Sequence, residues 1–244
     1  MMKHWLLKLP LFALCAASAC ATVMFDEDFE DSSIYVEGRP LPVDKGIIHH
    51  GQWDILSKSV QPGVVGQLEG NSFLELRATD RLKARAIGRF GYSNAEASLI
   101  ADALQFRLSF KISTSLNDTL HIQLCGGDGK ARASVGMDND GRLNVSFGGE
   151  REIVDTTLRP HTWYVLEFLM PEKPKTKSAF TFNLYEADGK TLISSKRGQI
   201  SRSVEDGGSS YSHFDIQHNV AGEILFIDNI KAVVNPETLK GATD

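Results

Sequence analysis

Residues 104–112 alternate apolar and polar side chains without interruption, and this stretch constrains the fold more than any other part of the chain. The apolar side chains stand at every second position: Leu104, Phe106, Leu108, Phe110 and Ile112. Successive side chains of a β-strand point to opposite faces, whereas those of a helix repeat about every 3.6 residues. The stretch therefore predicts a strand with one face in the core and the other in water.

The same strand-and-turn pattern continues along most of the chain. Further strands are predicted at residues 120–125, 131–137, 143–147, 162–169, 180–185 and 213–218. Residues 138–141 have the Asp/Asn/Gly composition of a hairpin turn. Many short strands at hairpin spacing are typical of sandwiches and jelly rolls. We therefore predict an all-β fold, a two-sheet antiparallel β-sandwich of the jelly-roll type.

Two stretches at opposite ends of the chain are expected to pair. Residues 223–234 are mostly apolar and carry one aspartate, Asp228, inside the apolar run. Residues 25–31 are rich in acids and are the expected partner, which brings carboxylates together where the sheet closes. The predicted core consists of apolar side chains from the alternating strands: Phe106, Leu108, Phe110, Ile122, Leu124, Val145, Phe147, Leu166, Phe182, Phe214 and Ile227.

The beginning of the chain has the pattern of an export signal. Lys3 and Lys8 precede an apolar run at residues 9–17, which is followed by small residues. Cleavage is expected after residue 21; in an alternative, residues 17–20 resemble a lipoprotein box with Cys20 acylated. The predicted organisation is a signal peptide at 1–21, a β-sandwich domain at 22–236 and a tail at 237–244. The protein is expected to be secreted or periplasmic, with a Cys20 lipid anchor as the alternative.

Charge and composition exclude several classes of partner. The formal net charge is −5 at pH 7 and no basic patch dominates, which argues against nucleic-acid binding. After the signal region, no stretch is long and apolar enough to span a membrane. Cys125 is the single cysteine of the predicted mature chain, so that chain has no intramolecular disulfide.

The sequence resembles the concanavalin A-like lectin/glucanase superfamily, which includes laminin G-like domains and laminarinase-type glucanases. The resemblance is carried by the acidic segment at residues 26–30, by Trp163 and Tyr164 after the turn at 159–162, and by residues 227–230. It implies a jelly-roll fold and a carbohydrate-related function. The glucanases' Glu-x-Asp-x-Glu motif is absent from this chain, so we assign no catalytic residues.

The resemblance also implies a structural calcium ion between the opening acidic segment and the aspartate of the closing strand. In this sequence the implied ligands are Glu27 or Glu30 together with Asp228. Calcium prefers oxygen ligands such as carboxylates, and a buried carboxylate needs a compensating partner. In the alternative interpretation, these acids lie on solvent-exposed edges.

The polar faces of the alternating strands provide candidate ligand-binding residues. If their strands are neighbours in one curved sheet, they line one concave surface; alternatively, they form the ordinary solvated face of a sandwich. The residues are Gln105, Arg107, Lys111, His121, Gln123, Arg132, Asn144, His213, Asp215 and Gln217. Such side chains suit an acidic polysaccharide, and a histidine can abstract a proton next to a uronate carboxylate. Tyr211 is the candidate acid for such a reaction.

We therefore expect a secreted, non-catalytic carbohydrate-binding protein. The alternative is a polysaccharide-degrading enzyme, a lyase rather than a hydrolase, acting on an acidic glycan. Trp53 and Tyr92 are added as platforms on which sugar rings can stack. The glycan-binding candidates are Arg107, His121, Gln123, Arg132, His213, Gln217, Trp53 and Tyr92.

Overall fold

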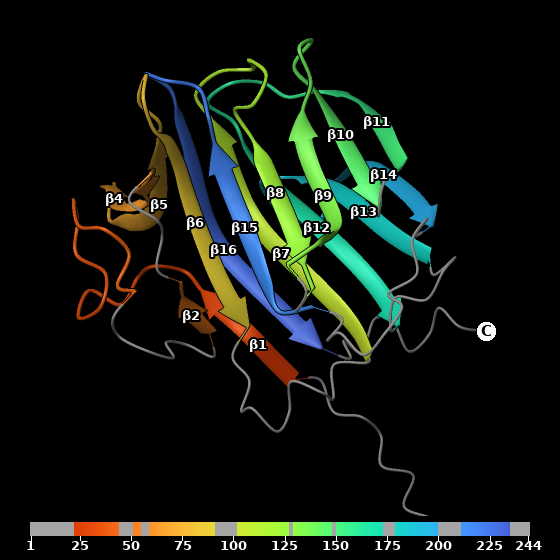
Figure 1. The fold of residues 1–244 in the computed structure, drawn as a ribbon, viewed down its shortest axis with the longest axis horizontal. Coiled ribbons are helices and arrows are strands. Elements are labelled where there is room, and N and C mark those ends of the chain that lie inside the picture. The colour runs from red at the N-terminus through yellow and green to blue at the C-terminus, as the bar shows by residue number, and fades with distance from the viewer. Residues whose placement is uncertain are drawn as a thin grey trace, which may run out of the picture.

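The computed structural model describes residues 22–43, 51–54, 59–90, 102–126, 129–147, 150–172, 179–199 and 211–234. These residues form two eight-stranded sheets, called sheet A and sheet B here, which stack face to face (Figure 1). The described residues contain no α-helix, and thus none that could cross a membrane. The predicted all-β sandwich is confirmed.

Sheet A has the strand order β14-β13-β12-β7-β16-β5-β4, and β1 also pairs with β16. Its strands are β1 (Thr22–Glu27), β4 (Val64–Leu68), β5 (Asn71–Arg77), β7 (Asp102–Ile112), β12 (Trp163–Glu172), β13 (Ala179–Glu186), β14 (Leu192–Gln199) and β16 (Ile224–Val234). All pairs in this sheet are antiparallel. Strands from both ends of the chain thus meet in one sheet.

Sheet B has the strand order β11-β10-β9-β8-β15-β6-β2, and β3 also pairs with β6. Its strands are β2 (Gly51–Trp53), β3 (Val60–Pro62), β6 (Lys83–Phe90), β8 (His121–Cys125), β9 (Ala131–Met137), β10 (Arg142–Phe147), β11 (Glu150–Thr157) and β15 (His213–His218). The short β3–β6 pair is parallel, and the others are antiparallel. In Figure 1, β15 and β8 lie in front of β16 and β7.

The core lies between the sheets and follows the alternation of the strands. Phe106, Leu108 and Phe110 of β7 point inward from sheet A and are fully buried. Phe214 and Ile216 of β15 point inward from sheet B and are also fully buried. Every side chain predicted for the core is buried, which confirms the register assigned from the sequence.

The opening and closing strands pair as predicted, from Thr22 opposite Val234 to Glu27 opposite Ile230. Strand β16 also carries an irregularity against β7 after Asp228, where Asn229 has a positive φ of 49°. A bulge adds a residue to one strand and turns nearby side chains, and asparagine tolerates the left-handed backbone that it needs. The bulge therefore separates Asp228 from the regular ladder that follows it.

Edge strands were not all predicted: β4 was missed in sheet A. No predicted strand covers β11 or β14 either. Both lie at the ends of the sheet orders, where few side chains are buried. Ile153 of β11 and Leu192 of β14 are each about half exposed, so neither strand shows a clear alternation. The predicted signal peptide, the Cys20 alternative and the predicted tail lie outside the described residues.

Candidate functional site

The outer face of sheet B gathers most of the predicted polar residues. His121 and Gln123 point outward from β8, because the side chains between and after them are in the core. On the neighbouring β15, Gln217 lies opposite His121 and Asp215 lies opposite Gln123. His213 is the third residue of β15 that points outward, together with Asp215 and Gln217. The sequence prediction that these residues share a surface is therefore correct for sheet B.

A partly buried ion pair anchors the centre of this face. Asp215 accepts hydrogen bonds from Arg85 of β6 on both carboxylate oxygens, from Nε at 2.8 Å and from Nη2 at 2.6 Å. Gln217 Nε2 also donates to Asp215 Oδ2 at 2.7 Å. A two-point guanidinium–carboxylate pair is strong and directional. These bonds raise the pKa of Arg85 although burial opposes the shift, and they fix the positions of both partner side chains.

A row of facing residues crosses the sheet next to this ion pair. Gln217, His121, Gly136 and Asn144 lie opposite one another on β15, β8, β9 and β10. A Cβ added to Gly136 would lie 3.6 Å from Asn144 Oδ1 and 3.8 Å from His121 Cδ2. Gly136 thus leaves a gap between the histidine and the asparagine. Glycine inside a strand often marks a place where a ligand approaches the backbone closely.

Asn144 carries an unsatisfied donor at the edge of this gap. The residue is only 7% exposed, and its Nδ2 is buried with no hydrogen-bond partner among the described residues. A buried donor without a partner costs about 1–3 kcal/mol of folding free energy. The atom of this amide that lies nearest Gly136 is Oδ1, so a ligand above Gly136 meets the unsatisfied Nδ2 donor when the amide turns over.

Both histidines of this face favour the neutral form. Burial lowers the pKa of His121, and Lys83 and Arg151 lower it further, against the opposing charges of Asp215 and Asp118. Its Nε2 lies 3.3 Å from Gln123 Nε2, so a neutral ring can accept that hydrogen bond. A neutral imidazole near pH 7 can bind a hydroxyl group or take up a proton.

Four basic side chains lie on this face, and two of them are paired with acids. Lys83, Arg85 and Arg89 point outward from β6, and Arg151 points outward from β11. Burial, and then the charge of Arg89, lower the pKa of His213. Arg85 is paired with Asp215 and Arg89 with Asp54, so the basic character of this face comes from Lys83 and Arg151, in a chain whose net charge is −5. This basic character favours an anionic ligand.

The pH dependence of stability follows from the two lowered histidine pKa values. The folded state binds fewer protons than the unfolded state once the pH falls below about 6.5, the ordinary histidine value. The contribution of these histidines to the free energy of unfolding should therefore be fully present above that pH. It should be lost as the pH falls toward the lower pKa values of the folded state. Melting temperatures measured between pH 8 and pH 5 should fall less for a His121→Gln/His213→Gln double variant. Equal slopes for both proteins would contradict the burial of these rings.

Three of the expected polar residues lie on the opposite side of the sandwich. Gln105, Arg107 and Lys111 belong to β7 of sheet A, so the ten residues do not share one surface. Arg107 lies 5.2 Å from the ring centre of Tyr185 and 3.9 Å from Glu167 Oε1. The prediction that Arg107 belongs with the histidines was wrong, because residues 104–112 pair with β12 and β16 rather than with β8.

Two aromatic candidates are buried rather than exposed. Trp53 is 1% exposed, and its Nε1 donates to the Tyr35 hydroxyl at 3.0 Å, so it cannot serve as a sugar platform. Tyr211 is fully buried, which raises its pKa and removes it as a candidate acid. Arg132 lies at an irregularity of sheet B and is only 7% exposed. Tyr92 lies outside the described residues.

The predicted calcium ligands bind separate partners in the structure. Glu27 accepts a hydrogen bond from the buried Tyr35 hydroxyl, and Glu30 Oε1 accepts one from the backbone of Ser72 at 2.7 Å. Asp228 Oδ2 accepts a bond from Asn71 Nδ2 at 3.3 Å. Among the described residues, no three or more acids, histidines or cysteines are grouped so as to hold a metal.

Calcium binding therefore remains a prediction with a direct test. Burial raises the pKa of Asp228 in spite of its two hydrogen bonds, and Glu30 and Asp28 raise it further. A cation bound here would relieve that repulsion and stabilise the folded state by about 2.7 kcal/mol at a hundredfold excess over Kd. EDTA should lower the melting temperature, calcium should restore it, and Asp228→Ala should abolish the response. An unchanged melting temperature in EDTA would show that no bound calcium ion stabilises the fold.

Three parts of the site were not singled out from the sequence. Arg85 was not among the predicted site residues, Gly136 was only part of the predicted strand at residues 131–137, and Asn144 was one of ten polar positions. Their importance depends on pairing between β6, β15, β8, β9 and β10, which are far apart in sequence. The one local signal was the glycine inside an otherwise regular strand.

Comparisons with known proteins bear on the fold. No family model and no curated protein matches the chain. Among solved structures, a sialidase superposes with a TM-score of 0.59 and 12% identity over 89% of this chain. The match covers 19% of the sialidase chain, so this chain corresponds to a small part of that protein.

Two other solved structures match over nearly their whole length. The catalytic domain of a glycoside hydrolase family 131 protein from Coprinopsis cinerea has a TM-score of 0.57 and 15% identity, covering 88% of this chain and 95% of that one. The CBM2 module of the evolved Dit protein of Lactobacillus casei BL23 phage J-1 has a TM-score of 0.51 and 14% identity, covering 88% and 97%. This chain has the fold of these carbohydrate-related sandwich proteins. At such low identity the similarity shows the fold alone.

Proposed function

We propose that the protein is an exported, concanavalin A-like sandwich protein that binds an acidic polysaccharide on the outer face of sheet B. The observation that carries the proposal is the gap at Gly136, between His121 and the unsatisfied, buried amide of Asn144. The basic side chains around this gap select a ligand with carboxylate or sulfate groups. The binding is non-catalytic.

The chemistry of the face fits a sugar acid. At Gly136, where the strand has no Cβ, a sugar can approach the backbone, with the Asn144 amide on one side and the neutral His121, which accepts or donates a hydrogen bond, on the other. Arg85, held by Asp215, and Arg151 supply positive charge on either side of the row. Outward-facing strand positions extend the surface over several strands. A chain of sugar units can therefore lie across the sheet.

The solved structures with this fold agree with a glycan ligand. Their descriptions name a glycoside hydrolase catalytic domain and a CBM2 module, so both enzymes and binding modules occur on this sandwich. We favour binding over hydrolysis because the sequence lacks the paired acids of glucanases.

The test is calorimetric titration with oligoglucuronate, oligogalacturonate and oligomannuronate, against neutral cello-oligosaccharide. The wild type should bind at least one acidic oligosaccharide, with affinity falling as salt increases. Gly136→Val fills the gap and should abolish binding. Gly136→Ala is the matched control for the backbone, because its Cβ makes only ordinary contacts, and it should keep the fold and most of the affinity. Binding that is unaffected by Gly136→Val would contradict the proposed location.

A second candidate function is a lyase acting on the same ligand. The observation that favours it is the neutral imidazole of His121 beside Gln123, a proton acceptor next to an amide that can bind the uronate carboxylate. The test for lyase activity uses the same mixtures of protein and acidic oligosaccharide. The absorbance of unsaturated uronates in them is followed over time. Absorbance that rises with the wild type and not with His121→Ala would establish the lyase; a flat trace supports binding alone.

A further inference from the structure

Two adjoining pockets lie at the end of sheet A, and the larger one also takes Thr156 and Thr157 from β11 of sheet B. One has a volume of about 390 Å³ and the other of about 200 Å³. They share Trp163, Tyr164 and Ala187, so they lie side by side where β12 begins. The larger volume falls within the range of about 300–1,000 Å³ that is usual for small-molecule sites.

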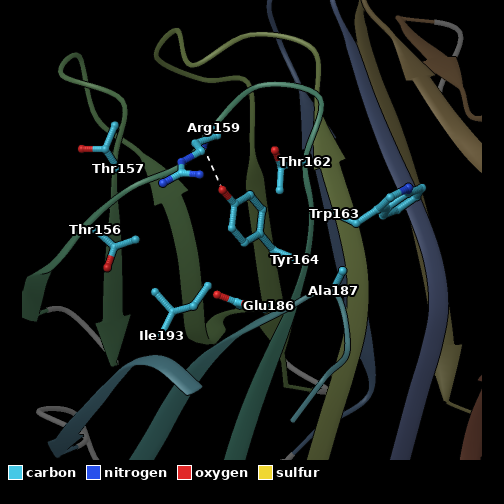
Figure 2. A pocket seen from close by; sticks show the side chains of 9 residues that line it. All are labelled: Thr156, Thr157, Arg159, Thr162, Trp163, Tyr164, Glu186, Ala187 and Ile193. Atoms are coloured by element: carbon cyan, nitrogen blue, oxygen red, sulfur yellow. Dashed lines mark hydrogen bonds between the residues drawn. The ribbon is translucent and has the colours of Figure 1, made fainter. Parts of the chain in front are cut away.

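Trp163 lines both pockets. Figure 2 shows it projecting from β12 to the opposite side from Tyr164, as consecutive residues of a strand do. The indole is held on the outer face of sheet A by Lys111, whose Nζ lies 4.9 Å from the ring centre, and by Phe73 at 6.4 Å between ring centres. Unlike the buried Trp53, it is partly exposed. A fixed and accessible indole is a suitable surface for stacking a sugar ring.

The smaller pocket adds hydrogen-bonding groups at fixed positions. Asp228 and Ser109 lie opposite each other on β16 and β7, and both line the pocket together with Asn71. Asn71 Nδ2 and the backbone N–H of Asn229 donate to the two oxygens of Asp228, at 3.3 and 2.7 Å. Each carboxylate oxygen keeps a further acceptor site for a sugar hydroxyl. The bulge at Asn229 thus helps to aim the carboxylate into the pocket.

The charges select a ligand that differs from the one proposed for sheet B. The smaller pocket is lined by one acid, Asp228, and by no basic residue. In the larger pocket, Arg159 and Glu186 offset each other, and the hydroxyls of Thr156, Thr157 and Thr162 complete a polar lining (Figure 2). A uronate would meet the Asp228 carboxylate, whereas a neutral sugar offers hydroxyl donors to it.

We propose that these two pockets form a second carbohydrate site, which binds a short neutral oligosaccharide with one pyranose ring against Trp163. Hydroxyl groups of that ring donate to Asp228 and accept from Asn71, and the next unit occupies the larger pocket. The smaller pocket, with Trp163 and Asp228, is lined from sheet A, whereas the gap at Gly136 lies on the outer face of sheet B. The protein can therefore hold an acidic and a neutral glycan at the same time.

The test is calorimetric titration with cellotetraose, laminaritetraose, mannotetraose and xylotetraose. The wild type should bind at least one of them. Trp163→Ala and Asn71→Ala should each weaken that binding about tenfold or more, the scale of one lost ring contact or strong hydrogen bond. Trp163→Phe keeps a ring and should retain most of the affinity. Leu192→Ala, an exposed change on the same sheet, is the matched control and should have no effect.

The outcomes separate this site from the one on sheet B. Gly136→Val should leave neutral tetraose binding intact, and Trp163→Ala should leave acidic oligosaccharide binding intact. If Trp163→Ala loses the far-ultraviolet circular dichroism of the wild type, Asn71→Ala decides the question. The proposal is overturned if no neutral tetraose binds, if binding survives a folded Trp163→Ala or Asn71→Ala variant unchanged, or if an acidic oligosaccharide binds through Trp163 instead.

Discussion

Replacing Phe214 with alanine should lower the free energy of unfolding by about 3–5 kcal/mol, the range for large aromatic side chains removed from a core. Phe214 is fully buried at the centre of the sandwich. Its ring centre lies 4.8 Å from that of Phe25 and 5.2 Å from that of Phe106, so it joins sheet B to both β1 and β7 of sheet A. Chemical denaturation measures the loss. A value below about 1 kcal/mol would contradict the described core.

Gly88 provides an internal control for the Phe214 prediction. Any Cβ at Gly88 would collide with the Phe214 ring, so Gly88→Ala should cost about 1–3 kcal/mol through overpacking. In the Phe214→Ala background the ring is gone, and the same change should cost much less. The two substitutions should therefore be strongly non-additive. Ile153→Ala on the exposed edge of sheet B should change stability by about 0.5 kcal/mol or less.

Asp215→Ala should have the next largest effect, a loss of about 1–3 kcal/mol of stability together with weaker acidic-glycan binding. The change leaves the donors of Arg85 and Gln217 without the acceptor that they share. The cost stays below the 3–5 kcal/mol expected for breaking a fully buried pair, because about a third of the Arg85 side chain is exposed. Denaturation and titration of the same preparation measure both effects.

The exposed pair between Asp26 and Lys231 is the matched comparison. Its atoms are 2.6 Å apart, but both side chains are nearly half exposed. Asp26→Ala should therefore change stability by only about 0–1 kcal/mol, as exposed pairs do. If Asp26→Ala and Asp215→Ala were equally costly, the Arg85–Asp215 pair would not be the anchor of the site. An Arg85→Ala/Asp215→Ala double variant should be closer to wild type than Asp215→Ala if the unpaired charge is the main cost.

The sequence was sufficient to predict the sandwich because the central strands alternate strictly. Residues 104–112 and 213–218 read as half-buried strands, and both lie inside their sheets with one face in the core. The edge strands β11 and β14 were missed because an edge strand buries few side chains and its pattern is weak. Apolar and polar residues alternate where one face of a strand is buried, so a strand that buries few side chains is not predicted from this pattern.

The candidate site could be predicted only in part, because alternation does not reveal which strands are neighbours. His121, Gln123, His213 and Gln217 were placed together correctly, whereas Arg107 has the same pattern but belongs to the other sheet. Trp53 was misplaced for a related reason: a short edge strand gives no reliable phase, and its indole turns into the core. Pairing between distant strands decides both cases, and one sequence carries little information about it.

The most direct measurement is a crystal structure of the protein with the acidic oligosaccharide that binds best in titration. The account predicts sugar density above Gly136, with a ligand oxygen within hydrogen-bonding distance of Asn144 Nδ2 and a second contact from His121. The acidic group should lie on the side of Arg85 or Arg151. Density for the acidic sugar on sheet A, or a bound sugar that leaves the Gly136 gap empty and Asn144 Nδ2 without a partner, would contradict the central claim.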